Sequence, residues 1–366
     1  MVNKEIVLEK INLVVDKLMN LGGADYDSDK STSKEAHKTG VIARDFGIEE
    51  FDWPQGVGLY GLEKLQTYYQ DNRYDSFLTK WYRNNIDRGL PSKNINTTAP
   101  YLTLLGLVER TGNKEYETMC LERAKWLMEE IPKTKEGGFQ HVTSAIGDRN
   151  GIALNESEMW IDTIFMAVLF LNRMGHRYQN QAWISEAEKQ ILIHIKYIYE
   201  KKNGLFYQRN DNYGGIFWCR GNSWFTLGMI DFLEASSNQI DQGLYEYLID
   251  TYKAHAKTLK ELQAPSGLWH TVLNEEDSYE EVSGSSAMAA GIRKAVRLGI
   301  LGQEYLPVAE KAVEAICANI DTDGTVLNVS AGTGIGEDSE HYKKIIKAPM
   351  AYGQSLALIA LCESLF

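Results

Sequence analysis

The sequence predicts an all-α protein folded as an (α/α)6 barrel, because one pattern recurs six times along its 366 residues. In each recurrence, a polar or glycine-containing loop with an aromatic residue or a proline precedes a helix that is too apolar to face water. The six recurrences are marked by Gly56, Ala99, Asp162, Asn222, Ser285 and Tyr352, at intervals of 43, 63, 60, 63 and 67 residues. A long repeat period of this kind indicates an architecture built from one repeated unit.

Six amphipathic segments alternate with the apolar ones. The apolar segments are WPQGVGLYGLEKL from Trp53, NTTAPYLTLLGLVE from Asn96, EMWIDTIFMAVLFL from Glu158, RGNSWFTLGMIDFLE from Arg220, SGSSAMAAGIRKAV from Ser283 and APMAYGQSLALIAL from Ala348. The amphipathic segments cover roughly residues 4–19, 74–87, 114–130, 180–199, 244–262 and 303–318. A helix that is apolar on every side must be covered on every side. We therefore expect an inner ring of six helices wrapped by an outer ring of six, forming a single domain over residues 1–366.

Short β elements are expected in the loops that lead into the inner helices. Glycine turns followed by alternating aromatic and polar residues predict strands or hairpins. The four candidates are GGFQHVT from Gly137, NGLFYQRN from Asn203, SGLWHTVL from Ser266 and DGTVLNVS from Asp323. Because each loop enters the start of an inner helix, the loops should gather at one end of the barrel. That end is where we expect the functional site.

Composition limits the possible partners and cofactors. With 44% hydrophobic and 24% charged residues the chain has ample material for a core, and its net charge of -12 argues against nucleic acid as a partner. The four cysteines are scattered without a Cys-x-x-Cys pair, so the sequence indicates no metal, disulfide framework or cofactor.

The N-terminal segment mixes Lys and Glu with apolar residues at helical spacing, unlike a signal peptide. The longest strongly apolar stretch, 164–171, falls well short of the roughly 20 residues that cross a bilayer. We therefore expect a cytoplasmic protein without membrane contact.

Asp162 stands out because it places a carboxylate at the opening of an inner helix that has no solvent-facing side. It could be an N-cap, a buried structural acceptor or a catalytic acid. Burial would raise its pKa, whereas the helix N-terminus would lower it. Glu158, four residues earlier, would share a helical face and is a candidate second carboxylate, as a two-carboxylate glycosidase requires. Neighbouring acids such as Glu156 and Glu158 are otherwise typical of helix caps.

The same loops carry aromatic and polar residues that suit a sugar, whose faces stack on rings while its hydroxyls seek hydrogen bonds. An alternative is that several of the Trp residues fill a wide barrel core. Arg220 should meet an anion, either a protein carboxylate such as Asp162 or a substrate carboxylate. His141 and His270 could bind sugar, transfer protons or form loop hydrogen bonds, and no His pair has metal-site spacing. The residues gathered at this end are Trp53, His141, Trp160, Tyr207, Trp218, Arg220, Trp224, Trp269 and His270.

Two further motifs are given less weight. The glycine-rich run from Gly332 to Glu337 lacks the strand, turn and helix context of a phosphate-binding loop. The acidic run near Asp277, DSYEEV, is expected to be a solvated turn leading into the fifth inner helix.

Taken together, these segments resemble the unsaturated rhamnogalacturonyl hydrolases of glycoside hydrolase family 105, relatives of the unsaturated glucuronyl hydrolases of family 88. The resemblance rests on WPQGVGLYGL, NINTTAP, GGFQH followed by NESEMWIDTIFMAVLFL, WCRGNSW, SGLWHTVL and SYEEVSGSSAMAAGI, in that order between about Trp53 and Gly353. It implies an (α/α)6 barrel that acts on oligosaccharides carrying an unsaturated uronic acid. The expected reaction removes 4,5-unsaturated galacturonic acid from the non-reducing end of rhamnogalacturonan oligosaccharides.

The resemblance also implies how one carboxylate could suffice. Such enzymes hydrate the C4=C5 vinyl ether instead of attacking the anomeric carbon. Protonated Asp162 would protonate C4, and its carboxylate would then activate the water that adds at C5. The resulting hemiketal opens and the neighbouring sugar leaves.

The resemblance assigns further residues to substrate binding. By the family pattern WxRGNxW, Trp218, Arg220 and Trp224 would shape the subsite of the unsaturated sugar, and Trp53 and His270 would close the mouth. The complete set expected to bind substrate is Trp53, Asn96, His141, Trp160, Gln208, Trp218, Arg220, Trp224 and His270.

Two positions depart from the family pattern. Gln208 stands where many members carry His, so contacts to water or sugar there should differ. Asn96 stands where the related glucuronyl hydrolases use a second Asp, which favours the rhamnogalacturonyl branch.

Three other functions remain open at this point. The chain could hydrolyse another unsaturated uronide, or it could be an N-acyl-hexosamine epimerase with His141 and His270 as bases. It could also be a non-catalytic sugar-binding protein in which Asp162 is only a cap. The same fold can carry all of these functions. The sequence indicates no oligomeric state.

Overall fold

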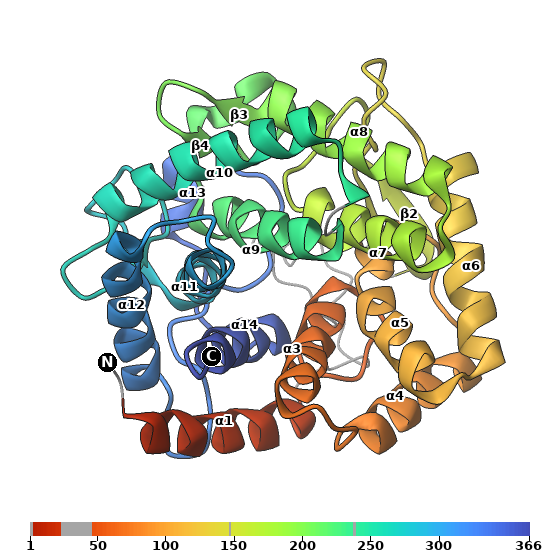
Figure 1. Cartoon of the computed structure of the whole chain (residues 1–366), viewed down its shortest axis with the longest axis horizontal. Coiled ribbons are helices and arrows are strands. Elements are labelled where there is room, and N and C mark those ends of the chain that lie inside the picture. Colours follow the sequence, from red (N-terminus) through yellow and green to blue (C-terminus); the bar gives the residue numbers. More distant parts are fainter. Residues whose placement is uncertain (1–2, 23–45, 146–147, 237–238) are drawn as a thin grey trace.

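The computed structural model describes residues 3–22, 46–145, 148–236 and 239–366, and its helices form two concentric rings (Figure 1). The inner ring contains α3 (Trp53–Tyr69), α5 (Pro100–Thr111), α7 (Leu169–Tyr178) with the preceding π-helical turn η4 (Ile164–Val168), α9 (Cys219–Ser236), α11 (Val282–Arg297) and α14 (Ala351–Glu363). The outer ring contains α1 (Lys4–Met19), α4 (Asp75–Asp87), α6 (Lys114–Glu129), α8 (Gln181–Ile198), α10 (Gln242–Leu262) and α12 (Leu306–Ala318). The predicted (α/α)6 barrel is confirmed.

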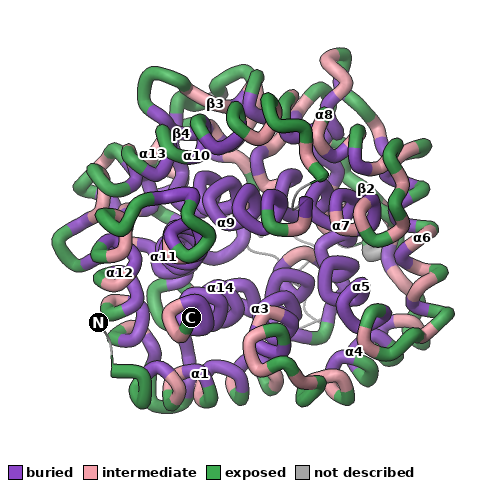
Figure 2. The backbone as a smooth tube through the Cα atoms, in the orientation of Figure 1, coloured by how far each residue is buried: buried purple, intermediate pink, exposed green. Residues whose placement is uncertain are grey.

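The inner ring is closed, because each inner helix packs on the next and α14 packs back on α3. Burial separates the two rings, as Figure 2 shows. All 13 residues of α14 are buried, whereas the equally long α4 buries only Leu78, Trp81, Tyr82 and Asn85. The apolar helices therefore lie inside, as their composition requires. No helix among the described residues is long and apolar enough to span a membrane.

Two glycines allow neighbouring inner helices to approach closely. A Cβ atom added to Gly56 in α3 would lie 2.5 Å from the backbone nitrogen of Pro100 in α5. A Cβ at Gly291 in α11 would lie 2.5 Å from the carbonyl oxygen of Thr226 in α9. Both distances are too short for any side chain, so these contacts require glycine.

Short strands precede three of the inner helices. β1 (Val142–Ala145) pairs with β2 (Asp148–Leu154), β3 (Tyr199–Glu200) with β4 (Leu205–Phe206), and β5 (Trp269–His270) with β6 (Glu280–Glu281), all antiparallel. The fourth predicted element, 323–330, forms isolated bridges instead of a strand: Val326 pairs with Ile320, and Ser330 pairs with Lys347. The remaining connections include the 3-10 turns η3 (Asn96–Thr98), η5 (Asn210–Gly215) and η7 (Gln303–Tyr305) and the short helix α13 (Ser339–Lys343).

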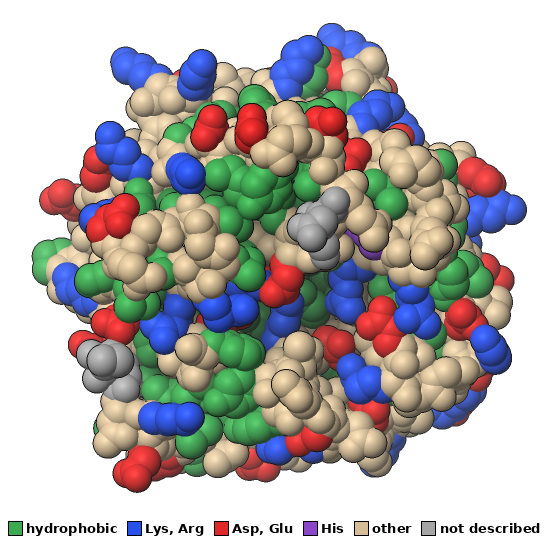
Figure 3. Space-filling model, in the orientation of Figure 1, with side chains coloured by type: hydrophobic (Ala, Val, Ile, Leu, Met, Phe, Trp, Pro, Cys, Tyr) green, Lys and Arg blue, Asp and Glu red, His purple; other side chains and the backbone are tan. Residues whose placement is uncertain are grey.

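The end of the barrel formed by the C-terminal parts of the inner helices is highly charged. On the face shown in Figure 3, Lys, Arg, Asp and Glu side chains gather around a central hollow. A cavity of about 980 Å³ is lined by α3, α5, α7 and α9, with Lys64, Arg110 and Arg173 among its cations. Cations suit this position because helix C-termini carry partial negative charge.

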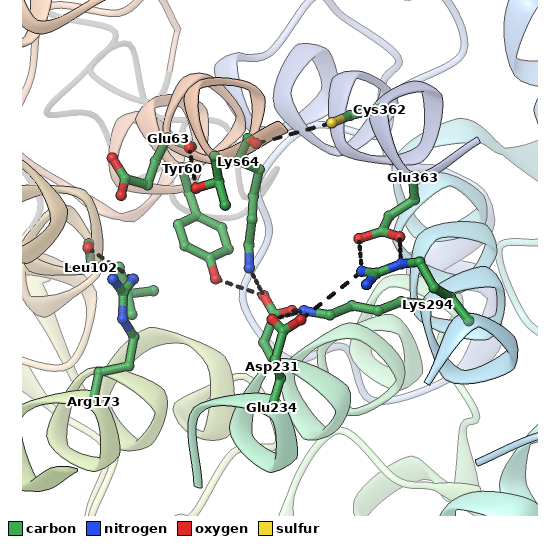
Figure 4. Close-up of polar contacts among 12 residues, drawn as sticks. Tyr60, Glu63, Lys64, Leu102, Arg173, Asp231, Glu234, Lys294, Cys362 and Glu363 are labelled. Atoms are coloured by element: carbon green, nitrogen blue, oxygen red, sulfur yellow. Dashed lines mark hydrogen bonds and ion pairs between the residues drawn. The ribbon is translucent and has the colours of Figure 1, made fainter. Parts of the chain in front are cut away.

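Asp231 of α9 is the centre of this charged end (Figure 4). It is 4% exposed, accepts a hydrogen bond from Tyr60 Oη at 2.6 Å, and lies 3.0 Å from Lys64 Nζ. Lys294 of α11 contacts its other carboxylate oxygen. Burial favours the neutral acid, but Lys294 and Lys64 outweigh it and lower the pKa of Asp231. Asp231 is therefore a fully compensated buried charge that joins three inner helices.

Candidate active site

The loops before the inner helices meet around one mouth, at the end opposite Asp231. Trp53 at the start of α3 stacks on Tyr352 at the start of α14, with ring centroids 4.6 Å apart. The loops before α7 and α9 also meet, because the Ile161 backbone N–H donates to the Gln208 carbonyl at 3.0 Å. The hairpin β1–β2 reaches back to α3, since Ser144 Oγ donates to Asp52 Oδ2 at 3.0 Å. The expected gathering of the loops at one end is confirmed.

Asp162 lies at this mouth, immediately before the turn η4. Its backbone carbonyl accepts the N–H groups of Phe165 and Met166 at 3.0 and 2.9 Å, and the π-helical turn follows directly. Such turns are rare and often occur at functional sites. The Asp162 side chain is 13% exposed, so it remains within reach of a small ligand.

The surroundings of the Asp162 carboxyl allow it to gain or lose a proton near neutral pH. Its Oδ1 atom has no hydrogen-bond partner among the described residues. Burial is the main influence and raises the pKa of Asp162 to about 7, although the N–H groups of Asp162 and Thr163 and the charge of Arg220 lower it. Desolvation thus outweighs the helix N-terminus here. A carboxyl with this pKa suits general acid and base catalysis.

His141 and Trp160 form a wall beside Asp162. Their rings stack with centroids 3.7 Å apart and an angle of 9°, and His141 Nδ1 lies 4.0 Å from Asp162 Oδ1. Neither ring nitrogen of His141 has a hydrogen-bond partner among the described residues. Burial, assisted by His194, lowers the pKa of His141 to about 3, so its ring is neutral at pH 7. A neutral ring does not compensate an ionised Asp162.

Glu158 is not placed as expected. The helix begins after Asp162, so Glu158 shares no helical face with it. Its carboxylate instead accepts a hydrogen bond from Trp160 Nε1 at 2.7 Å and binds Arg209 Nη1 at 2.6 Å. Both oxygens are engaged within the protein, which disfavours Glu158 as a second catalytic carboxylate.

Arg220, at the start of α9, is buried and binds backbone carbonyls. Its two terminal nitrogens donate to the carbonyl oxygens of Ser330 and Ala331 at 2.7 and 2.8 Å. The Glu281 carboxylate lies 4.0 Å from Arg220 Nη1. The protein carboxylate beside Arg220 is therefore Glu281 and not Asp162, although the charge of Arg220 does act on Asp162.

Glu281 itself corrects a prediction, because the acidic run DSYEEV is not wholly a solvated turn. Glu281 is fully buried and caps α11, accepting hydrogen bonds from the backbone N–H groups of Ser283 and Gly284. It also accepts the N–H of Ser330 at 2.9 Å. These N–H groups and the nearby charge of Arg220 stabilise the Glu281 carboxylate in this buried position.

Aromatic rings line the remaining side of the mouth. Trp53 is half-buried and meets the ring of Trp224 edge-on at 6.2 Å. The guanidinium of Arg220 lies over Trp218, 4.4 Å from its ring centroid, and over Tyr352 at 4.9 Å. Trp218 and Trp224 are themselves 5% and 2% exposed, so Trp53 is the most accessible of the three Trp rings for stacking on a sugar.

The other predicted residues differ in their freedom to bind. Asn96 is half-buried in η3, and His270 is half-buried with Nδ1 2.6 Å from the Ser278 carbonyl. Gln208 is buried with no described partner for Oε1, which lies against Gly221. Trp269 is not at the mouth surface: it is fully buried and donates to the Leu259 carbonyl of α10.

Sequence reasoning missed Asp52, a second buried acid at the mouth. It caps α3, accepting the Trp53 N–H at 2.8 Å, and is 5% exposed. The signal was present, because Asp directly before Trp53 and Pro54 is an N-cap pattern. No cluster of three or more potential metal ligands occurs in the described part of the chain.

Comparison with known proteins places this geometry in a family. The family model described as Glycosyl Hydrolase Family 88 matches residues 28–365. The chain belongs to glycosyl hydrolase family 88.

Individual relatives agree with the family assignment. The chain is 29% identical over 347 residues to the unsaturated rhamnogalacturonyl hydrolase YesR of Bacillus subtilis, covering 93% of this chain and 96% of that protein. A solved structure from Salmonella enterica, described as a possible member of the GH105 family, is 32% identical with a TM-score of 0.90 and covers 100% of this chain and 95% of that one. A structure from Klebsiella pneumoniae with the same description is 33% identical, with a TM-score of 0.88 and coverage of 100% and 94%.

Proposed function

We propose that this family 88 chain removes the 4,5-unsaturated galacturonyl residue from the non-reducing end of rhamnogalacturonan oligosaccharides. The observation that carries this proposal is the Asp162 carboxyl, which is largely buried, has no described hydrogen-bond partner at Oδ1 and has its pKa raised by burial to about 7. Hydration of a vinyl ether needs one group that first donates and then accepts a proton. The relationship to an unsaturated rhamnogalacturonyl hydrolase over nearly the whole chain supports this substrate class.

The reaction proceeds in two proton transfers at Asp162. The protonated carboxyl donates to C4, the C4=C5 π electrons form the new C–H bond, and the ring oxygen stabilises the positive charge at C5. The resulting carboxylate removes a proton from the water that adds to C5, which restores the acid and produces a hemiketal. The hemiketal opens by breaking the bond between C5 and the ring oxygen, which leaves a ketone at C5 and a hemiacetal at C1. The hemiacetal collapses to an aldehyde and releases the neighbouring sugar as an alcohol, so one water is consumed for each glycosidic bond broken.

The surroundings of Asp162 suit both steps. The neutral His141 ring and Trp160 exclude water on one side without fixing the carboxyl in its ionised form. The positive charge of Arg220 acts on Asp162 and stabilises the carboxylate after the first transfer. Substrate contacts by Trp53, Asn96, His141, Trp160, Gln208, Trp218, Arg220, Trp224 and His270 remain predictions, as does the cytoplasmic location. The single domain over residues 1–366 also remains a prediction.

The competing functions find less support. A two-carboxylate glycosidase would need Glu158, whose oxygens bind Trp160 and Arg209. Asp162 accepts backbone N–H groups as a cap does, but its Oδ1 is not hydrogen-bonded to any described residue and is left for a substrate. The epimerase hypothesis would require His141 and His270 as paired bases, and the relatives named as unsaturated uronide hydrolases favour hydration instead.

The test is the loss of near-ultraviolet absorbance of the conjugated double bond when the protein is added to lyase-generated oligosaccharides. We expect loss with rhamnogalacturonan fragments and slower or no loss with fragments in which the unsaturated uronate is attached to another sugar. Faster turnover of another unsaturated uronide would move the chain to that substrate. No turnover of any unsaturated uronide would contradict the proposal.

A further inference from the structure

Glu158 is a carboxylate beside the mouth that the hydration mechanism does not use. One oxygen accepts the indole N–H of Trp160 and the other binds Arg209, at 2.7 and 2.6 Å. The side chains of Glu158 and Arg209 are only 23% and 15% exposed, so this ion pair is partly shielded from water. Glu158 therefore joins the segment before Asp162 to the segment before α9.

The backbones of these two segments already meet in register. Trp160 and Arg209 form an antiparallel bridge, and the Asn210 N–H donates to the Met159 carbonyl at 3.0 Å. Backbone bonds fix where the Trp160 Cα lies but leave the indole free to rotate about its side-chain bonds. Two direct contacts orient the indole: its bond to Glu158 and its stack on His141.

The orientation of Trp160 matters because this ring covers His141. The two rings are nearly parallel, and His141, which is fully buried, lies 4.0 Å from Asp162 Oδ1. If the indole turned away, water could reach His141 and then Asp162. The other charged or titratable groups acting on this region include Arg220 at α9, His194 on α8 beyond His141, and Asp211, which binds Arg209 at 2.9 Å.

We propose that Glu158 is a positioning residue that holds Trp160 flat on His141 and so keeps water from reaching Asp162 from the His141 side. Its effect on turnover rests on the proposed function, but its effect on the hydration of Asp162 does not. Glu158 acts through Trp160 and does not contact the reacting atoms. Its role differs from that of a catalytic base, which would need a free carboxylate oxygen.

The substitutions Glu158→Ala and Glu158→Gln separate these roles. Gln retains an acceptor for the indole N–H and loses only the ion pair, whereas Ala loses both contacts. We expect Glu158→Gln to stay within a few-fold of the parent kcat and Glu158→Ala to lower kcat about 10-fold, with a smaller change in KM. Glu156→Gln is the matched control, because Glu156 is exposed two residues away, and it should leave both constants unchanged.

The deciding measurement is the pKa of Asp162 in the unliganded protein. Aspartate labelled with carbon-13 at the carboxyl group reports it by NMR, and the Asp162 signal is assigned by its absence in Asp162→Asn. In Glu158→Ala, water entry should lower this pKa from about 7, and the basic limb of kcat/KM should move to lower pH by roughly 0.5 to 1 unit. Glu158→Gln should retain most of the parent value.

Two results would overturn the proposal. An unchanged Asp162 pKa in Glu158→Ala would show that Glu158 does not control its hydration. Equal loss of activity in the Gln and Ala variants, with unchanged pKa, would identify Glu158 as a catalytic base. If the parent protein turned over no unsaturated uronide, the proposed function would fail while the NMR titration still decided the role of Glu158.

A folding failure of Glu158→Ala would not end the test. Trp160→Phe removes the N–H donor while preserving an aromatic ring. Arg209→Met removes the ion pairs of Arg209 with Glu158 and Asp211 while preserving the indole contact. We expect the first to lower the Asp162 pKa in the same direction and the second to resemble Glu158→Gln. A larger fall of the Asp162 pKa in Arg209→Met than in Trp160→Phe would contradict positioning through Trp160.

Discussion

Asp162, just before the inner helix α7, and Asp231, on the inner helix α9, are largely buried acids at opposite ends of the barrel, and their surroundings give them opposite properties. Asp231 accepts a bond from Tyr60 and meets Lys64 and Lys294, so its pKa is lowered. Asp162 has a neutral imidazole beside it and an oxygen, Oδ1, with no hydrogen-bond partner in the described part of the chain, and burial raises its pKa to about 7. Burial alone does not determine what a carboxylate does. The partners that accompany it decide whether it contributes to stability or is available for proton transfer.

The largest expected effect is on the acid at the mouth. Asp162→Asn preserves shape but can neither donate nor accept the proton, so we expect kcat to fall about 10³-fold or more in the absorbance assay. The free energy of unfolding at pH 8 should be unchanged or higher, because Asn removes the cost of a buried ionised group. A folded Asp162→Asn variant with normal turnover would place the chemistry on another residue.

Asp231→Asn should lower stability and leave kcat unchanged, the reverse of Asp162→Asn. It leaves Lys64 and Lys294 without their shared counter-charge, so the free energy of unfolding in urea should fall by about 3 kcal/mol. The kcat of the protein that remains folded should be retained, because Asp231 is far from the mouth. Glu129→Gln is the control, since Glu129 and Lys125 form an exposed pair at 3.7 Å whose loss should cost less than about 0.5 kcal/mol. Loss of kcat together with stability would show that the two ends are coupled.

The pH dependence should also differ between the two acids. Turnover needs protonated Asp162 in the free enzyme, so kcat/KM should be level below pH 7 and fall about tenfold per unit above it.

The contributions of the two acids to the free energy of unfolding should change with pH in opposite directions. The lowered pKa of Asp231 gives stability that is complete above about pH 4 and is lost on further acidification. The raised pKa of Asp162 gives stability that declines between about pH 4 and pH 7 as the unfolded chain releases its proton. A kcat/KM profile that rises through pH 7 would contradict the acid role of Asp162.

The smallest expected effect concerns Arg220, the buried cation at the mouth. Arg220→Lys loses one of the two donors to the Ser330 and Ala331 carbonyls, so the free energy of unfolding should fall by about 1–2 kcal/mol. The Lys side chain also lacks the planar group that lies over Trp218, so KM should rise a few-fold. Arg83→Lys, in an exposed pair with Glu115, is the control and should change neither quantity. An Arg220→Lys variant that loses substrate binding without losing stability would indicate a direct contact with the substrate.

Much of the architecture was predictable from local patterns. Helices that are apolar on every side and helices with one polar stripe can be distinguished by composition, and each type occupies the predicted ring. Helix α3 begins at Trp53 and α14 begins at Ala351, where polar loop residues give way to an apolar segment in the sequence. Asp162 could be singled out for the same reason, because a carboxylate conflicts with the apolar segment that follows it.

The tertiary structure alone decided how the polar groups are partnered. Glu158 and Arg209 are 51 residues apart, and Arg220 and Ser330 are 110 apart, so no local pattern reveals that they bind each other. Glu281 was expected in a solvated turn because its neighbours are acidic, yet it is buried against Ser330. The sequence by itself determined the rings, the end at which the loops gather and the acid that is out of place there. Whether a buried acid is compensated, as Asp231 is, or left to hold its proton, as Asp162 is, depends on charges brought from distant segments, because electrostatic interactions act through space and not along the chain.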